Sequence, residues 1–484
     1  MNWLTLVRLL PVLESRRQIT RIEVPGLDRY GDESRSEVVI PPTPEVPTEP
    51  RHSILPAERM QAKPRCRPKP AAAATLAAGV ILACHLGATA SEPTLFFQQL
   101  THGPKHHFFG YIGQCRTIPW SGDGHYLLAL QASFLDRMPG PKDEAEVVLL
   151  DTQADHRLRV VDRSRAWNPQ QGTMLHWDPH QPSTRCFFND RDPKSGKVFT
   201  VLYDISKGRR LREYRFEDTP VGNSGVAQGG GWFLAINYAR LARLRPVTGY
   251  PGAYDWTRGQ PAPADDGIFR VDAETGQKQL IVSFAQLKEK LRDLDPGIER
   301  RHLFINHTLV NRNSDRVYFY CRADFESEPE SKRLNVPFTV RPDGTELTVQ
   351  RVFIGGHPDW AEGVQIIGAK DKQQVVYDVL TQQIVRVLGG VSIFPNPGGD
   401  IALSPDGRWL VNGHSDSGGN AYTFLDLTTG RVLRSPVLRV GTWSSKELRL
   451  DPAPCWNRSN DAIVVTGLAD DGTRQMFLLQ LKGP

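Results

Sequence analysis

Cysteine is scarce in this chain of 484 residues, which holds six in all. After Ala90 only four remain, Cys115, Cys186, Cys321 and Cys455, and they are scattered along the sequence. Cysteines this far apart do not form a disulfide framework, and their pairings cannot be ranked from sequence. None has the spacing of a metal-binding motif. We therefore expect free thiols packed as small apolar groups.

Most of the chain also lacks an excess of charge of either sign. The formal net charge is +5, but the first ninety residues hold 12 basic and 9 acidic side chains, which leaves 47 basic against 45 acidic for the remainder. A nearly neutral body argues against nucleic acid as a partner. The 42 glycines and 37 prolines indicate many turns rather than long helices, which excludes a helical bundle.

The amino-terminal region differs in composition from the rest. Residues 33–50 are rich in proline and poor in aromatic side chains, so we expect them to be extended or disordered. From Met60 a basic stretch leads into an apolar run that ends in Ala88-Thr89-Ala90, a site typical of signal peptidase cleavage. We interpret residues 60–90 as a signal segment. Residues 1–59 are then a disordered leader, or an over-long gene prediction if the true start is Met60.

Two alternatives remain for the apolar run. Residues 71–90 are about long enough to stay in a membrane as an anchor. The sequence Ile81-Leu82-Ala83-Cys84 loosely resembles a lipobox. We expect a secreted or periplasmic protein if the segment is removed, and a membrane-anchored protein or a lipoprotein if it is kept.

An internal repeat fills the rest of the chain, residues 91–484. One unit is an apolar strand, a short polar turn and another apolar strand, as in VVLLDTQADHRLRVV (147–161) and TFLDLTTGRVLRSPV (423–437), and each copy predicts a β-hairpin. Ahead of every hairpin stands a polar turn that enters a strand, as in SPDGRWLVNG (404–413). Together these make seven copies of a four-stranded unit, minus one strand at the carboxyl end.

The repeat predicts an all-β fold, a seven-bladed β-propeller. One small sheet cannot bury both of its faces, so the copies must pack against one another, and closing them into a ring removes exposed edges. The segment TLFFQQLT, Thr94–Thr101, can supply the missing strand of the last blade. The amphipathic stretch Ser283–Leu294 predicts a helix between the third and fourth blades. A β-sandwich is the alternative fold, and seven matched turns make it the poorer one.

Three histidines are candidates for the site, because propellers bind ligands where loops gather at one end of the ring. His176 stands beside Trp177 at the start of the second blade. His307, which follows Asn306, and His357 precede innermost strands of later blades. We interpret the three histidines as recurring at equivalent places, and hydrogen-bonded core histidines are the alternative.

Three arginines, Arg240, Arg243 and Arg245, lie within six residues of the segment NYARLARLRP. An arginine inside a strand would need a carboxylate partner, whereas arginines that end a strand and fill a loop can converge on an external anion. A solvated surface is the alternative for one or two of them. The nearby Tyr238 and Tyr250 favour a sugar as the ligand.

Several segments together resemble the propeller-type polysaccharide lyases, in particular the ulvan lyases and more distantly the oligogalacturonate lyases. They are HHFFGY (106–111), RAWNPQQGTMLHW (165–177), NYARLARLRPVTGY (237–250), FINHTLVN (304–311) and GGHPDW (355–360). The resemblance extends from about Thr94 to the carboxyl end. It implies a secreted enzyme that cleaves a uronate-containing polysaccharide or oligosaccharide, ulvan-like or pectic, by β-elimination.

The resemblance also implies roles for the candidate residues. Removal of the proton α to a uronate carboxylate builds negative charge on it, which Arg240 would neutralise with Arg243 or Arg245 behind it. His176 is the first choice for proton transfer and His107 the second, because imidazole titrates near neutrality. Contacts to substrate would come from the sugar-stacking Trp177 and Tyr250 and from polar groups, which are His106 and Asn306.

Two features of the resemblance concern the base and a metal. Such lyases commonly carry a tyrosine shortly before the arginine, where this chain has Asn223 and Ser224, so Tyr238 would replace it or the protein would bind without cleaving. Oligogalacturonate lyases hold a divalent metal on clustered histidines. His307 and His357 match such positions, with a third ligand near Asp400, and the ion would be Mn, Ca or Zn. We expect no other cofactor.

A second hypothesis comes from a different class of function. The same fold can be a non-catalytic periplasmic propeller, TolB-like or WD40-like, that serves as a binding or interaction scaffold. On either hypothesis we expect a monomer. The lyase hypothesis names an acidic polysaccharide or oligosaccharide as the partner. A membrane would be a further partner only if residues 71–90 are retained.

Overall fold

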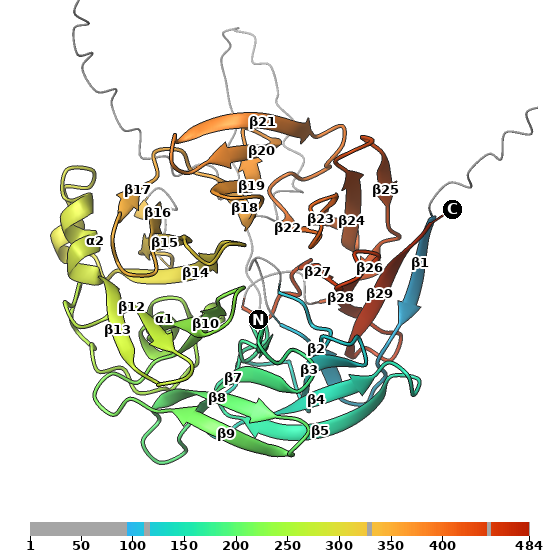
Figure 1. The fold of residues 1–484 in the computed structure, drawn as a ribbon, viewed down its shortest axis with the longest axis horizontal. Helices are drawn as coiled ribbons and strands as arrows, with labels where there is room; N and C mark the ends of the chain where they lie inside the picture. Colours follow the sequence, from blue (N-terminus) through green and yellow to red (C-terminus); the bar gives the residue numbers. More distant parts are fainter. Residues whose placement is uncertain (1–93, 111–116, 327–331, 443–446, 484) are drawn as a thin grey trace, which may run out of the picture. The chain divides into compact units, whose positions relative to one another are not determined.

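The structure is a computed structural model, and it describes residues 94–110, 117–326, 332–442 and 447–483. The leader and the signal segment expected at residues 1–90 lie outside these residues. In the described part, seven β-sheets are arranged as blades around a central axis (Figure 1). The chain is therefore a seven-bladed β-propeller, as its repeat predicts.

Each blade has four antiparallel strands in order, blade six has a fifth, and the first strand of blades one to six lies nearest the axis (Figure 1). Blade one has β2 (His106–Phe108), β3 (Tyr126–Ala132), β4 (Ala145–Asp151) and β5 (Arg157–Ser164). Blade two has β6 (His176–Trp177), β7 (Arg185–Arg191), β8 (Val198–Asp204) and β9 (Arg209–Tyr214). Blade three has β10 (Gly222–Val226), β11 (Trp232–Ile236), β12 (Gly267–Asp272) and β13 (Lys278–Ser283).

The other half of the ring follows the same order. Blade four has β14 (Phe304–Val310), β15 (Val317–Ala323), β16 (Leu334–Val340) and β17 (Thr348–Val349). Blade five has β18 (Gly355–Trp360), β19 (Gln365–Lys370), β20 (Gln373–Asp378) and β21 (Gln383–Gly390). Blade six has β22 (Asp400–Leu403), β23 (Trp409–Asp416), β24 (Gly419–Asp426) and β25 (Val432–Arg434), and β26 (Leu438–Arg439) also pairs with β24.

Blade seven closes the ring with strands from both ends of the described chain. Its strands are β27 (Cys455–Trp456), β28 (Ala462–Leu468), β29 (Arg474–Lys482) and β1 (Thr94–Gln99). β1 pairs antiparallel with β29, from Thr94 opposite Lys482 to Gln99 opposite Phe477. The rings of Phe97 and Phe477 stack 5.4 Å apart across this pair. The expected closing strand is thus confirmed.

The core lies between the blades, because each blade buries both faces of its middle strands against its neighbours. One apolar cluster joins Leu128 of β3, Val201 of β8 and Met476 of β29, which belong to blades one, two and seven. This packing explains why the middle strands are apolar on successive residues rather than on alternate ones. Within the blades, polar turns such as Ser404–Trp409, between β22 and β23, reverse the chain, and Gly407 has the left-handed φ of 76° that such a turn needs.

Two α-helices interrupt the strands of the described residues. α2 (Phe284–Leu291) follows β13 and begins with a capping box between Ser283 and Gln286, which confirms the predicted helix. α1 (Tyr238–Leu244) follows β11 directly, and the short helices η2 (Pro246–Thr248) and η3 (Ile298–Arg300) complete the set. Among the described residues no helix combines the length and the apolar character needed to cross a membrane.

Candidate functional site

The arginine-rich segment forms a helix, so the expectation that it ends a strand and fills a loop is wrong. The side chain of Asn237 accepts hydrogen bonds from the backbone of Ala239 and Arg240, and this cap begins α1 immediately after β11. Arg240 and Arg243 are three positions apart and therefore neighbours on one face of α1, whereas Arg245 stands at its carboxyl end. The three side chains have different partners.

Arg240 is buried and its guanidinium is bonded to internal acceptors. Its Nε donates to Leu303 O at 2.6 Å, and its terminal nitrogens donate to Gln260 O at 3.0 Å, Pro261 O at 2.5 Å and Thr257 Oγ1 at 3.1 Å. Burial lowers the pKa of Arg240 to about 10, so it stays cationic at neutral pH. This arginine therefore joins α1 to the loops before β12 and β14.

The other two arginines of α1 have separate surroundings. Arg243 Nε donates to Asp255 Oδ2 at 2.9 Å. Arg245, at the carboxyl end of α1, lies over the ring of Phe325, 4.9 Å from its centre. Of the three, Arg245 is the one that faces the charged groups near the axis, as described below.

Tyr238 and Tyr250 stack on each other rather than presenting a face to solvent. Their rings lie 4.4 Å apart with an interplanar angle of 18°, and each side chain is 1% exposed. Tyr238 Oη donates to Asn223 O at 3.0 Å, and Asn189 Nδ2 donates to Tyr250 Oη at 3.0 Å. Burial raises the pKa of Tyr250 above its usual value. In this arrangement neither ring is accessible to a sugar.

Asp266 is the buried carboxylate beneath α1. Its titration should change the free energy of unfolding with pH. It accepts hydrogen bonds from Asn237, Thr257 and the backbone of Gly267, yet burial outweighs them and raises its pKa to about 6. The folded state thus holds this proton more tightly than the unfolded state, whose carboxyl titrates near pH 4. Its contribution to the free energy of unfolding therefore falls as the pH rises from about 4 to about 6, by about 3 kcal/mol.

The measurement is urea denaturation of the parent and of Asp266→Asn across this pH range. The variant lacks the titrating group, so the difference between the two free energies of unfolding should shift in favour of the variant as the pH rises. A difference that stays constant with pH would contradict the raised pKa.

His107, the second choice for proton transfer, is enclosed between two blades. Its Nδ1 lies 2.8 Å from Gln475 Oε1 and its Nε2 lies 2.9 Å from Gln131 Oε1. The ring is 1% exposed and links β2 to β29 and β3. The neighbouring His106 accepts a hydrogen bond from the backbone of Arg474 at 3.1 Å, and burial lowers its pKa. Both histidines thus contribute to the junction of blades one and seven.

His176 and Trp177 line a recess at the end of the ring where the first and second strands of the blades are connected. The recess has a volume of about 330 Å³, and Gln228 and Arg458 also border it. Burial lowers the pKa of His176 to about 3, which makes it a weak base at neutral pH. Trp177 is 5% exposed and its Nε1 donates to Pro119 O at 2.7 Å.

The strand register shows that His176 is not equivalent to His307. His176 pairs with Phe187, and the next pair, Trp177 with Cys186, is the last one before the turn between β6 and β7. In blade four this position belongs to Leu309, which pairs with Tyr318, and His307 lies two residues earlier in an irregularity of β14. The expected equivalence of all three histidines is therefore wrong for His176.

The equivalence does hold for His307 and His357. Both lie in irregularities of their innermost strands and both have left-handed backbone angles, with φ of 58° and 48°. In blade two Met174 has the corresponding φ of 56°. A shared bulge thus places one side chain of each of these blades near the axis.

His307, His357 and Asp400 lie together on three successive blades, and we call them the axial site. The rings of His307 and His357 are 5.0 Å apart, and His357 Nδ1 is hydrogen-bonded to Asp400 Oδ1. Burial raises the pKa of Asp400 against the opposing effect of His357. Within the described ranges no group of three such side chains is arranged to hold a metal ion, so the metal stays a prediction.

Asn306 fixes the orientation of the His307 ring. Asn306 Oδ1 accepts the backbone N–H of His307 at 3.0 Å, so its amide nitrogen faces His307 Nε2 at 3.2 Å. An amide nitrogen only donates, and Nε2 must therefore accept. The hydrogen of the neutral ring is then on Nδ1, where it can be donated to another group.

Cationic groups surround His307. Its pKa is held well below the usual value by burial first, and then by His357, Arg322, Arg245 and Arg449. Arg322 and Arg245 stack on the ring of Phe325, at 4.8 Å and 4.9 Å from its centre, and Arg333 lies at 5.8 Å. The axial site therefore lies in a positive electrostatic environment.

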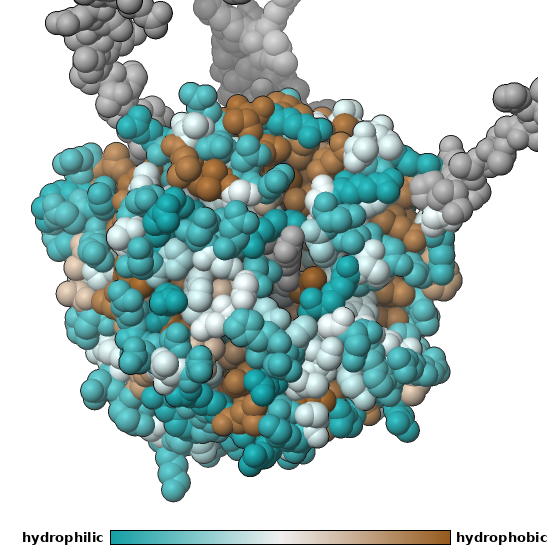
Figure 2. All heavy atoms as spheres, viewed as in Figure 1, coloured by the Kyte–Doolittle hydropathy of each residue, from teal (hydrophilic) through white to brown (hydrophobic). Residues whose placement is uncertain are grey.

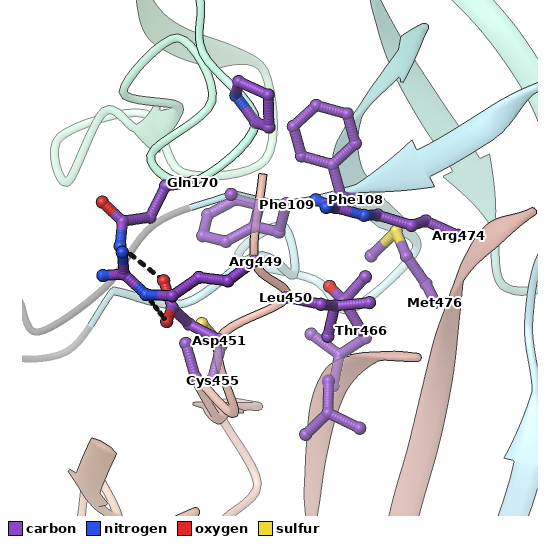
Figure 3. Close-up of a pocket in the computed structure, with 15 residues that line it drawn as sticks. Phe108, Phe109, Gln170, Arg449, Leu450, Asp451, Cys455, Thr466, Arg474 and Met476 are labelled. Atoms are coloured by element: carbon purple, nitrogen blue, oxygen red, sulfur yellow. Dashed lines mark hydrogen bonds and ion pairs between the residues drawn. The ribbon is translucent and has the colours of Figure 1, made fainter. Parts of the chain in front are cut away.

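Arg449 is held at the edge of this environment by an aspartate. Its Nε donates to Asp451 Oδ1 at 2.8 Å, and Gln170 Nε2 donates to Asp451 Oδ2 at 2.5 Å. Figure 3 shows these three side chains next to one another, beside a pocket that Phe108 and Phe109 also line. Arg449 acts electrostatically on both His307 and Asp400.

The predicted residues therefore fall into separate groups. The axial site brings together His307 and His357, with Asn306 and Arg245 close by. Sequence reasoning missed Arg322, Arg449 and Phe325, because they belong to a second strand and to loops that carry no repeated signature. The other candidates lie elsewhere: His176 and Trp177 in the recess, His106 and His107 at the blade junction, and Tyr238, Arg240, Arg243 and Tyr250 around α1.

Comparisons with known proteins found matches in structure but none in sequence. No family model matches the sequence, and no curated protein matches it. The β-propeller domain of Cps50 (Swd1) from Myceliophteria thermophila is similar in structure, with a TM-score of 0.41, 12% identity, and coverage of 78% of this chain and 100% of that one. A putative TolB from Agrobacterium tumefaciens has a TM-score of 0.36 and 13% identity, with coverage of 81% and 98%.

Proposed function

We propose that this propeller is a binding module that takes an anionic ligand, with an acidic oligosaccharide as the first candidate, at the axial site. One observation carries the proposal: the guanidinium groups of Arg322, Arg245 and Arg449 all act electrostatically on His307. Asp451 pairs with Arg449 and Asp400 is bonded to His357, so the site already holds two carboxylates, and three guanidinium groups near one imidazole still attract an anion. Guanidinium groups also match the planar geometry of a carboxylate.

The geometry of the donors fits the same kind of ligand. His307 Nδ1 can donate a hydrogen bond because Asn306 occupies the other ring nitrogen. Arg245 and Arg322 lie over the ring of Phe325, and Arg322 Nε also donates to Asn335 Oδ1, so these side chains are ordered before a ligand arrives. Preordered donors bind an anion with a smaller loss of conformational entropy.

The lyase hypothesis has less support from the geometry than the binding module. β-Elimination needs a base and a carboxylate-binding group around one reacting carbon. Arg240 is bonded to four internal acceptors, Tyr238 is stacked and bonded to Asn223, and His176 lies in the recess rather than at the axial site. Cleavage therefore stays a prediction to be tested beside binding.

Isothermal titration calorimetry with a matched set of ligands tests the proposal. A short oligogalacturonate and a short ulvan fragment should bind, a neutral cello-oligosaccharide of the same length should not, and affinity should fall as salt is added. Equal heats for charged and neutral ligands would refute an anion site. If the ultraviolet absorbance of the unsaturated uronyl product rises in the same mixtures, the protein is a lyase rather than a non-catalytic binding module.

A further inference from the structure

The outermost strands of blades one and two carry a concentration of arginine that the balanced body of the chain does not share. β5 and β9 together hold six arginines and two acidic residues. We call these the arginine stripe: Arg157, Arg159, Arg163, Arg209, Arg210 and Arg212. No other outermost strand of the described ring has more than one basic residue.

One member of the arginine stripe joins the two strands. Arg210 of β9 donates to Asp162 of β5 at 2.8 Å and 2.9 Å, and to the backbone oxygen of Arg163 at 3.1 Å. The two strands are therefore neighbours on the perimeter of the ring, where Figure 1 shows them side by side. Seen from the same side, this stretch of perimeter is covered mainly by hydrophilic residues (Figure 2).

Three other members face solvent without a carboxylate partner. Arg157, Arg159 and Arg209 are exposed, and no ion pair is found for them among the described residues. Arg159 lies 5.5 Å from the ring centre of Tyr126, which orders it without neutralising it. Arg157 and Arg159 are two positions apart on one strand, so their side chains are about 7 Å apart on the same face.

The arrangement suits a linear polyanion. Exposed guanidinium groups on two neighbouring outermost strands can each take one acidic group of a chain that runs across them. A membrane surface would also need apolar side chains to insert, and Val160 is the single large apolar side chain exposed on the two strands. Single-stranded nucleic acid would also need exposed aromatic rings on which its bases stack, and β5 and β9 expose none.

We propose that the arginine stripe binds a linear acidic polysaccharide along the perimeter of blades one and two. This inference rests on the proposed function for its class of ligand, but it uses different residues on a different part of the ring. A short oligosaccharide would report on the axial site. A long polymer would report on the stripe as well, because a chain bound at two places gains avidity.

Paired charge reversals on two blades test the inference. Arg157→Glu/Arg209→Glu changes the stripe, and Lys372→Glu/Arg386→Glu changes exposed residues at blade five by the same net charge. Binding of polygalacturonate is measured by biolayer interferometry at low salt, and binding of a short oligogalacturonate by calorimetry. Arg159→Glu serves as a second stripe variant, and melting temperatures verify that each variant is folded.

The stripe pair should weaken polygalacturonate binding by about tenfold or more, while the blade-five pair and the affinity for the short ligand stay at the parent level. Equal losses in both pairs, or no polymer binding by the parent, would overturn the inference. Tighter stripe-dependent binding of anionic phosphatidylserine vesicles or of an oligonucleotide would overturn it in favour of that class. Polymer binding that depends on the stripe without any binding of the short ligand would refute the axial site alone.

Discussion

Replacement of Arg240 by alanine should lower the free energy of unfolding by about 3–5 kcal/mol. The side chain is 1% exposed, and its nitrogens donate to three backbone oxygens, those of Leu303, Gln260 and Pro261. Alanine would leave these oxygens buried without donors. It would also remove the guanidinium that stacks 4.6 Å from the ring centre of Phe284 on α2.

Urea denaturation measures this effect, with Arg341→Ala as the matched control because that arginine is on the surface. Arg240→Lys should fall between the two, since an ammonium cannot span all the acceptors. The lyase hypothesis predicts the opposite pattern for Arg240→Ala, a loss of turnover at an unchanged melting temperature. An unchanged denaturation midpoint would therefore return Arg240 to the candidates for ligand binding.

Removal of β1 should have a comparable effect on the whole ring. A chain that begins at Leu100 lacks the strand that pairs with β29 from Thr94 to Gln99. It loses the hydrogen bonds of that ladder and the packing of Leu95 against the cluster of Phe477 and Leu479, which together contribute about 3–6 kcal/mol. It also exposes β29 as an open edge that can pair with another molecule.

Thermal unfolding and size-exclusion chromatography compare this chain with one that begins at Ser91 and keeps β1. The shorter chain should melt at a lower temperature and form larger species. If both chains melt together and elute as the same species, closure by β1 contributes little to the stability of the propeller.

The fold was predictable because each copy of the repeat contains residues that mark where its strands end and its turns begin. Each hairpin is marked by an aspartate and a polar turn, and Asp272 shows why: its side chain accepts hydrogen bonds from the backbone of Glu274 and Thr275 and so fixes the turn. The closing strand was predictable from the one strand that the last repeat lacks. The cap of α1 was missed because a single asparagine, Asn237, is a weak signal beside a strongly apolar strand.

The candidate site was harder to predict, because the place of a side chain in the propeller depends on the pairing register of its strand. His176 and His307 both lie in innermost strands, but His307 stands two residues earlier in the register, in a bulge of β14. Arg322 and Arg449 approach the axis from a second strand and from a loop, and only the closed ring brings them to His307. Other candidate residues proved to be buried. The sequence alone could not show that the hydrogen bonds of Arg240 all go to internal acceptors.

Calorimetric titration of a short oligogalacturonate into His307→Asn and His176→Asn tests the axial site most directly. Asparagine tolerates the left-handed backbone at position 307, so the first variant removes the imidazole with little strain. Binding should weaken by about tenfold or more in His307→Asn, as expected for the loss of a hydrogen bond to a charged group, and stay at the parent level in His176→Asn. Full affinity in His307→Asn together with a loss in His176→Asn would contradict an axial site and place the ligand in the recess instead.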